Sequence, residues 1–268
     1  RDVYKRQGEK GSHCEGARND YGPTCTNRHG IEFNKCMELA DLGINGWAIL
    51  TSGAAVAGWI DAVIGGGGLV LIPLIMAVAP QLAPATALAT NKVAAVSGTA
   101  SAAFTLVRKV RPSAAELIRL GLAAMVCSGL GAGAAAMIDK DVMRPLIIVL
   151  MVCVGVFVAF RPSFGTNESE GIRGGWRTWA ALGAVACIAF YDGIFGPGTG
   201  MFLIMAFTAI FSQNFLRSAA MSKVVNTCTN VGALIVFILG GHILWGLALV
   251  LAAANVLGAQ LGARTVLG

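Results

Sequence analysis

Hydrophobic residues form long runs along this chain, separated by short polar segments. A membrane-spanning helix needs about 20 largely apolar residues, and most of these runs approach or exceed that length. The pattern predicts an all-α, polytopic membrane protein with about seven segments. The segments are Gly46–Ile64 continued as Leu69–Ala79, Pro84–Val107, Leu117–Ile138, Met143–Phe160, Thr178–Phe195 continued as Met201–Phe211, Leu216–Leu239 and Ile243–Leu267.

Glycine-rich stretches interrupt two of the apolar runs. Each glycine costs a helix about 1 kcal/mol relative to alanine, and irregular backbone persists in a bilayer only where protein or a water-filled cavity satisfies its polar groups. Paired interruptions in corresponding halves indicate the binding site of a secondary transporter. The first interruption comprises Gly65, Gly66, Gly67 and Gly68, and the second comprises Gly196, Pro197, Gly198, Thr199 and Gly200.

The two interruptions belong to a longer internal repeat. From Asp61 to Ala102 the first half aligns with the second at a constant offset and without a gap, which matches Asp61 with Asp192 and Lys92 with Lys223. Each half therefore has one acid in its interrupted run and one lysine in the next run.

The repeat sets the predicted domain boundaries. Residues 37–162 form the first membrane repeat, residues 163–177 a cytoplasmic loop and residues 178–268 the second repeat. The fourth segment of the first repeat has no counterpart in the second. We therefore expect the second repeat to be truncated at its C-terminus, and an intact protein with about eight segments.

The first 36 residues differ from the rest, because they are polar and lack an apolar period. We interpret residues 1–36 as a non-native or disordered leader, with the membrane protein starting at Met37. The alternative is a small metal-binding lobe, although its spacing matches no common zinc motif. The ligands of that lobe would be His13, Cys14, Cys25, His29 and Cys36.

Composition supports a membrane protein and restricts its partners. The chain is 56% hydrophobic and 13% charged, with a mean hydropathy of +0.70, whereas soluble domains contain about 25% charged residues. Residues 45–268 carry the whole net charge of +6, which favours contact with lipid head groups or a small anionic solute. No basic stripe with interleaved aromatic residues is present, so we expect no nucleic-acid partner. A homo-oligomer is left open.

The sequence offers no set of residues typical of an enzyme. A membrane-embedded enzyme or redox partner would need a nucleophile with its base, paired haem-ligating histidines or a paired-cysteine motif at membrane depth. None is visible in the sequence. We therefore predict a protein that is not an enzyme and has no cofactor and no metal site.

Basic residues predict the orientation in the membrane. Two basic loops are expected in the cytoplasm, and the loop Asp139–Arg144 outside. The sequence leaves open whether the interrupted runs cross the membrane, giving parallel repeats, or turn back as hairpins, giving inverted repeats. The basic loops contain Arg108, Lys109 and Arg111 after the second segment, and Arg161, Arg173 and Arg177 after the fourth.

Four ionisable residues lie deep in apolar sequence, namely Asp61, Lys92, Asp192 and Lys223. Such residues usually face a polar interior, because each costs about 2.5–3.5 kcal/mol at a helix centre on insertion scales. The lysines suit anion capture, and the aspartates suit proton coupling or pairing with a lysine while the site is empty. The alternative is static pairing of Asp61 with Lys92 and of Asp192 with Lys223, which only holds helices together.

Polar neighbours favour a binding site at the lysines. Lys223 and Asn226 share a helical face with Ser222 beside them, and Asn91 directly precedes Lys92. The half-helices that follow the glycines would also present backbone N–H groups and positive dipole ends, which hold anions. The alternative for the polar side chains is hydrogen bonding between helices, worth about 0.6 kcal/mol per pair in membranes.

Three stretches carry a family resemblance: GWIDAVIGGGGLVLIP at 58–73, ALATNK at 87–92 and YDGIFGPGTG at 191–200. Together they resemble the sulfite exporter TauE/SafE family of membrane permeases, over residues 37–268. The resemblance implies about eight membrane segments in two repeats, the inner membrane of a bacterium, and movement of sulfur-containing anions such as sulfite and organosulfonates. It assigns Asn91, Lys92 and the two glycine-rich turns to the site.

We therefore predict a secondary transporter, acting as an exporter of small sulfur-containing anions. A membrane channel or a structural membrane subunit for another anion or small metabolite is the alternative. The predicted substrate-binding residues are the two interruptions with Asn91, Lys92, Ser222, Lys223 and Asn226, and the predicted coupling residues are Asp61 and Asp192.

Overall fold

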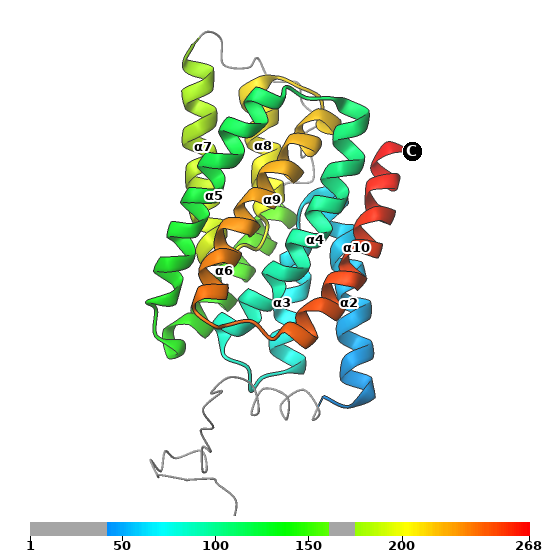
Figure 1. The fold of residues 1–268 in the computed structure, drawn as a ribbon, viewed down its shortest axis with the longest axis vertical. Helices are drawn as coiled ribbons and strands as arrows, with labels where there is room; N and C mark the ends of the chain where they lie inside the picture. The colour runs from blue at the N-terminus through cyan, green and yellow to red at the C-terminus, as the bar shows by residue number, and fades with distance from the viewer. Residues whose placement is uncertain (1–41, 161–174) are drawn as a thin grey trace, which may run out of the picture. The chain divides into compact units, whose positions relative to one another are not determined.

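The computed structural model describes residues 42–160 and 175–268, and these two ranges fold into helices and short turns (Figure 1). The predicted leader, its alternative metal lobe, and Arg161 and Arg173 lie outside the described residues. The helices are α2 Gly43–Ile64, α3 Gly67–Val78, α4 Pro84–Val110, α5 Ala114–Ala136, α6 Lys140–Ala159, α7 Trp176–Ile194, α8 Thr199–Phe211, α9 Phe215–Leu239 and α10 Trp245–Leu267.

The two glycine-interrupted runs are re-entrant hairpins. α3 folds back along α2, which brings Val78 at its end beside Gly46 near the start of α2. In the second hairpin, Arg177 near the start of α7 donates a hydrogen bond of 3.4 Å to the carbonyl of Phe211 at the end of α8. With 12 and 13 residues, α3 and α8 are only about 18 and 20 Å long. Both are too short for a hydrocarbon core of about 30 Å.

The two repeats are inverted relative to each other. The hairpin α2–α3 opens at the lower end of Figure 1 and the hairpin α7–α8 at the upper end. Contacts agree with this direction, because Gly121 of α5 faces Cys228 of α9 and Gly129 faces Gly232, so that α5 and α9 run the same way. The question that the sequence left open is therefore decided in favour of inverted repeats.

The equivalent helices α5 and α10 each pack against the other repeat. α10 packs on α2 and α4, and α5 packs on α7 and α9. The closest approaches obey the repeat, because Gly131 of α5 faces the carbonyl of Phe190, and the equivalent Gly262 of α10 faces the carbonyl of the equivalent Trp59. Such small residues let helix backbones approach closely in membranes. The two repeats are thus interlocked.

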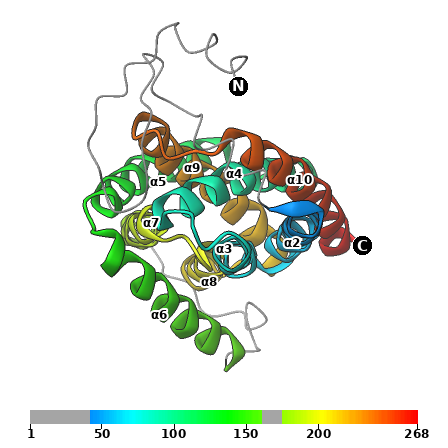
Figure 2. The ribbon, with the colours of Figure 1, turned by 90° about the horizontal axis from the view of Figure 1, so that it is seen from below.

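α6 differs from the other helices in direction. Figure 2 looks along α2, α3 and α8 and shows α6 lengthwise at the edge of the bundle. Met143 and Ile147 of α6 are buried, whereas Ile148, Val149 and Val152 are exposed. The predicted fourth segment is therefore a steeply inclined peripheral helix. By length and composition alone, α2, α5, α9 and α10 qualify as membrane spans among the described helices.

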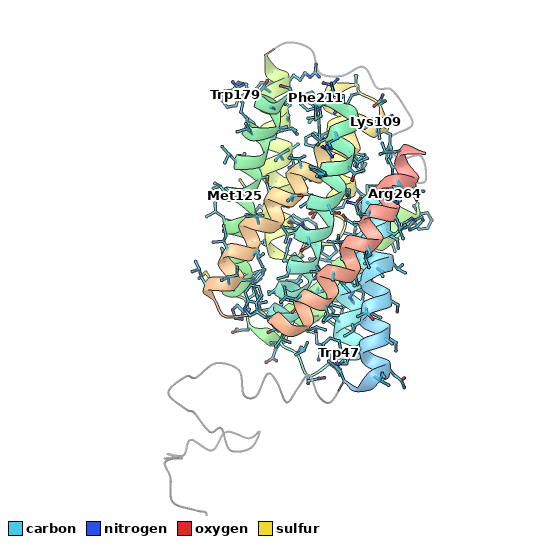
Figure 3. All side chains as sticks on the ribbon, turned by 45° about the vertical axis from the view of Figure 1, so that its right-hand side comes forward. Trp47, Lys109, Met125, Trp179, Phe211 and Arg264 are labelled. Atoms are coloured by element: carbon cyan, nitrogen blue, oxygen red, sulfur yellow. The ribbon has the colours of Figure 1, made fainter. Side chains whose placement is uncertain are left out.

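The ends of the bundle carry the features of membrane interfaces. Figure 3 shows Trp47 near one end and Trp179 with Lys109 near the opposite end; tryptophan is enriched at both membrane interfaces. The predicted basic loop after α4 lies at the same end as the start of α7. The positive-inside rule then predicts that this end faces the cytoplasm, as the sequence also predicted.

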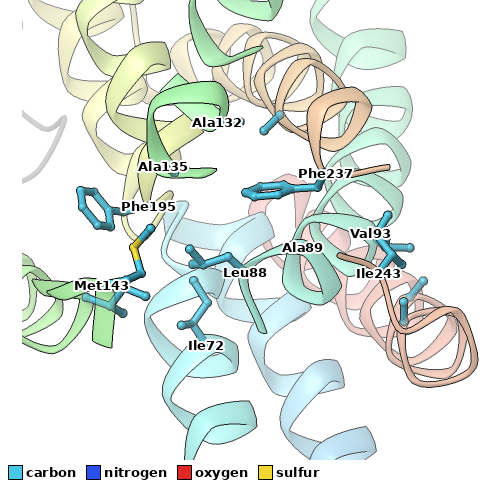
Figure 4. Close-up of a cluster of buried hydrophobic side chains, with 14 residues drawn as sticks. Ile72, Leu88, Ala89, Val93, Ala132, Ala135, Met143, Phe195, Phe237 and Ile243 are labelled. Atoms are coloured by element: carbon cyan, nitrogen blue, oxygen red, sulfur yellow. The ribbon is translucent and has the colours of Figure 1, made fainter. Parts of the chain in front are cut away.

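A core cluster fixes α4 against both hairpins. It includes Ile72 of α3, Leu88 and Val93 of α4, Phe195 beside the second interruption and Phe237 of α9 (Figure 4). Leu88 and Val93 flank Lys92 in sequence and both are buried. The apolar packing therefore holds α4, which carries Lys92, in place between the two hairpins.

Candidate functional site

The two glycine-rich turns meet in the centre of the bundle. We call Gly65–Gly68 the first tip and Gly196–Gly200 the second tip. A Cβ atom built on Gly200 would lie 2.6 Å from the Cα of Gly65, and one built on Gly68 would lie 3.5 Å from the Cα of Pro197. Gly65 and Gly200 thus leave no room for a side chain on either residue.

Each tip begins with a glycine in the left-handed region. Gly65 has φ 86° and Gly196 has φ 89°, and the two positions are equivalent in the repeat. A left-handed glycine ends a helix without the penalty that a Cβ imposes. The half-helices then start at Gly67 and Thr199, slightly earlier than the predicted starts at Leu69 and Met201.

The four buried ionisable residues form two ion pairs that cross between the repeats. Lys92 Nζ lies 2.7 Å from Asp192 Oδ2, and Lys223 Nζ lies 3.0 Å from Asp61 Oδ2. The pairing that the static alternative assumed, Asp61 with Lys92 and Asp192 with Lys223, is therefore wrong. In the inverted fold each lysine reaches the tip of the opposite repeat.

Each lysine also caps a broken helix. Lys92 Nζ donates to the carbonyl of Asp192 at 2.7 Å, and Lys223 Nζ donates to the carbonyl of Asp61. These carbonyls lie in the last turns of α7 and α2, where the helix dipole is negative and a cation is stabilising. The ammonium groups therefore contact helix C-termini, whereas the sequence had associated them with the N-terminal anion cradle.

The two ion pairs differ in the exposure of their side chains and in the hydrogen bond that the second carboxylate oxygen accepts. The side chains of Lys92 and Asp192 are each 2% exposed, whereas those of Lys223 and Asp61 are 0% and 15% exposed. Asp192 Oδ1 accepts from the Thr199 hydroxyl at 2.7 Å, but Asp61 Oδ1 accepts only a longer bond, 3.3 Å, from the N–H of Gly67.

The predicted polar neighbours occupy different surroundings. Ser222 donates to the carbonyl of Gly200 at 2.8 Å, and Asn91 directs its amide nitrogen toward Gly68. Asn226 instead accepts from Thr229 at its side-chain oxygen, 3.2 Å away, and belongs to a polar group along α9. The structure therefore brings Asn91 and Ser222 to the tips and gives Asn226 no hydrogen bond to them within the described ranges.

Sequence reasoning missed two polar residues. The Tyr191 hydroxyl donates to the carbonyl of Pro197 at 2.8 Å and fastens the second tip. Asn255 of α10 is buried and donates to the carbonyl of Ala54 at 3.1 Å. The position of Tyr191 directly before Asp192 was a usable signal, whereas nothing in the sequence pointed to Asn255.

The site is polar but carries no metal-ligand cluster. Across residues 42–160 and 175–268, no three His, Cys, Asp or Glu side chains gather as a cation would require. The groups that converge on the tips are ammonium, carboxylate, hydroxyl and backbone amide. Such an arrangement suits exchange of one anionic group for another.

Comparison with known proteins identifies the family. The family described as sulfite exporter TauE/SafE matches residues 50–268. This chain belongs to the TauE/SafE family. No solved structure matches it. It is thus a multi-pass transporter of the bacterial inner membrane.

Three bacterial relatives of this TauE/SafE chain cover most of its length. The probable membrane transporter protein YfcA of Escherichia coli K12 is 37% identical over 80% of this chain and 78% of the relative. A probable membrane transporter protein of Haemophilus influenzae is 34% identical over 85% and 88%, respectively. The probable membrane transporter protein ORF9 of a Sinorhizobium species is 31% identical over 84% and 85%.

Proposed function

We propose that this TauE/SafE protein exports small sulfur-containing anions, such as sulfite and organosulfonates, through the site between the two tips. The observation that carries the proposal is the pair of crossed Lys–Asp contacts where the two broken helices meet. A buried ion pair is costly to keep in an apolar surrounding. A protein that needed only packing would be served as well by apolar residues.

A sulfur oxyanion can replace an aspartate at its lysine. Both groups present negatively charged oxygens, so the exchange leaves no buried ammonium unpaired, which would cost several kcal/mol. The displaced carboxylate of Asp61 or Asp192 then binds a proton, because an unpaired buried carboxylate is also costly. The aspartates thereby couple anion binding to proton binding.

The tips supply the remaining donors. The N-terminal ends of α3 and α8 present backbone N–H groups and positive dipole ends at Gly65–Gly68 and Gly196–Gly200. Asn91 and Ser222 directly precede Lys92 and Lys223, and Asn226 lies one helical turn after Lys223; their side chains can donate hydrogen bonds. Inverted repeats with a site at their interface favour alternating access.

Sulfite flux into and out of proteoliposomes tests this function. The proposal predicts saturable flux that thiosulfate and an alkylsulfonate compete for, with chloride as a weak competitor. Empty liposomes prepared in the same way are the control. Flux that rises linearly with concentration and resists competition would favour the channel alternative, and absence of flux for every sulfur oxyanion would contradict the proposed substrate class.

A further inference from the structure

The two tips are equivalent in the repeat but not in their hydrogen bonding. We propose that the anion binds at the first tip, between Asn91 and the start of α3, while the second tip is a fixed lock. This assignment rests on the proposed transport of a sulfur oxyanion and locates that anion on one side of the pseudo-symmetric site.

Three side-chain hydroxyls fasten the second tip. The hydroxyls of Tyr191, Thr199 and Ser222 each donate one hydrogen bond of 2.7–2.8 Å to a neighbouring oxygen. The acceptors are the carbonyls of Pro197 and Gly200 and the carboxylate of Asp192. A tip held by three such bonds has little freedom to rearrange around a ligand.

The first tip lacks every one of these bonds. At the equivalent positions of the first repeat, Ile60, Gly68 and Asn91 replace Tyr191, Thr199 and Ser222. Ile60 and Gly68 have no polar side-chain atom. Asn91 keeps the ability to donate, but its side chain makes no hydrogen bond within the described parts of the chain.

The Asn91 side chain lies beside this tip. The residue is only 5% exposed, and its Nδ2 atom lies 3.8 Å from the place that a Cβ on Gly68 would occupy. Buried side-chain amides almost always have a partner. The space next to Gly68 is therefore the place where a missing acceptor would sit.

Backbone donors without an acceptor occur at both tips. The N–H of Gly66 donates to no oxygen in residues 42–160 or 175–268, and the same holds for Gly196 and Gly198 at the second tip. Of the first-turn amides of α3, that of Gly67 donates to Asp61 Oδ1 at 3.3 Å. α3 has 12 residues, so its dipole adds positive potential at Gly67. The first tip combines the Gly66 N–H with the Asn91 amide, and these donors suit an anion with several oxygens, such as sulfite or a sulfonate.

The two ion pairs also favour the first tip as the place where the anion binds. Lys223, which serves the first tip, pairs with Asp61, whose side chain is 15% exposed against 2% for Asp192. Asp61 is also without a hydroxyl donor equivalent to Thr199. The pair at the first tip is therefore the easier one for an anion to open.

Gly68→Ala and Asn91→Leu test the assignment in the full chain. The nearest atoms to a Cβ on Gly68 lie at 3.5–3.8 Å, which is ordinary contact, so Gly68→Ala should fold while its methyl group fills the anion position. Asn91→Leu keeps the shape and removes the donor. We expect both variants to bind sulfite at least tenfold more weakly than wild type by calorimetry on the purified protein.

Tyr191→Phe is the matched change at the second tip. It removes one fastening bond and should lower the melting temperature, with sulfite affinity within twofold of wild type. Wild-type sulfite affinity in both Gly68→Ala and Asn91→Leu would overturn the assignment of the anion to the first tip. An equal loss of affinity in Tyr191→Phe would overturn it as well. In either case, sulfite flux through the wild-type protein would still support the proposed function. Wild-type protein without sulfite binding or flux would contradict the proposed function itself.

Discussion

Lys92 of the first repeat pairs with Asp192 of the second repeat at 2.7 Å, and Asp61 of its own repeat pairs with Lys223 instead. The exchange follows from the inverted fold, in which the tip of each hairpin meets the central helix of the opposite repeat. Both lysines therefore tie the two halves of the transporter together at the site.

The crossed pairing predicts which second substitution rescues the first. Lys92→Ala leaves Asp192 buried and unpaired and should cost about 3–5 kcal/mol, the usual range for breaking a buried pair. Adding Asp192→Asn should restore most of that loss, whereas adding Asp61→Asn should not. Denaturant unfolding in detergent measures the difference. Rescue by Asp61→Asn alone would contradict the crossed arrangement.

Much of this arrangement could be predicted from the sequence, because membrane spans need long apolar runs and charged residues within them are conspicuous. The interruptions, the repeat and the four ionisable residues all follow from that reasoning. Pairing could not be predicted, since the repeat matches equivalent residues without saying which of them touch. The direction of the hairpins was also open, because the loop at Gly240–His242 carries no Lys or Arg to orient it.

The Asn91 environment was beyond sequence reasoning for a different reason. Asn91 and Ser222 are equivalent positions with similar hydrogen-bonding ability, and only the coordinates distinguish a bonded hydroxyl from an amide without a partner. Likewise, Asn226 shares a helical face with Lys223, but it turns to Thr229 on its own helix. A polar side chain can bond to its own helix and not to a ligand, and the spacing of residues in the sequence does not reveal which it does.

The contact between the tips predicts a severe effect of a single methyl group. Gly200→Ala places its Cβ 2.6 Å from Gly65, so the hairpins must separate, and we expect a lower melting temperature together with lost sulfite flux. Gly133→Ala is the matched control, because no atom lies within 4 Å of its Cβ. That change should be neutral or stabilising by up to about 1 kcal/mol. Equal behaviour of the two variants would show that the tips do not touch.

Inverted repeats predict opposite accessibility for two equivalent loops. In a cysteine-free background, Gln81→Cys lies after α3 and Gln213→Cys lies after α8. A membrane-impermeant maleimide should label position 81 in intact cells and position 213 only in inside-out vesicles, since the basic end faces the cytoplasm. Labelling of both positions from the same side would require parallel repeats.

Proton coupling through Asp61 predicts a pH signal with a defined origin. If the displaced carboxylate takes a proton, sulfite movement should carry acid equivalents that a trapped pH dye records. Asp61→Asn cannot bind that proton and should remove the part of the signal that depends on this group, while the protein remains inserted. The free movement of undissociated sulfurous acid is subtracted with empty liposomes. An unchanged dye signal in Asp61→Asn would exclude this residue as the coupling group.

Sulfite efflux from proteoliposomes of single variants decides whether the paired lysines bind the transported anion. Lys92→Ala and Lys223→Ala should each reduce the initial rate at least tenfold at matched protein insertion. Arg217→Ala, an exposed cation at the start of α9, should keep the wild-type rate. Wild-type efflux in both lysine variants would show that neither ammonium group takes part in anion transport.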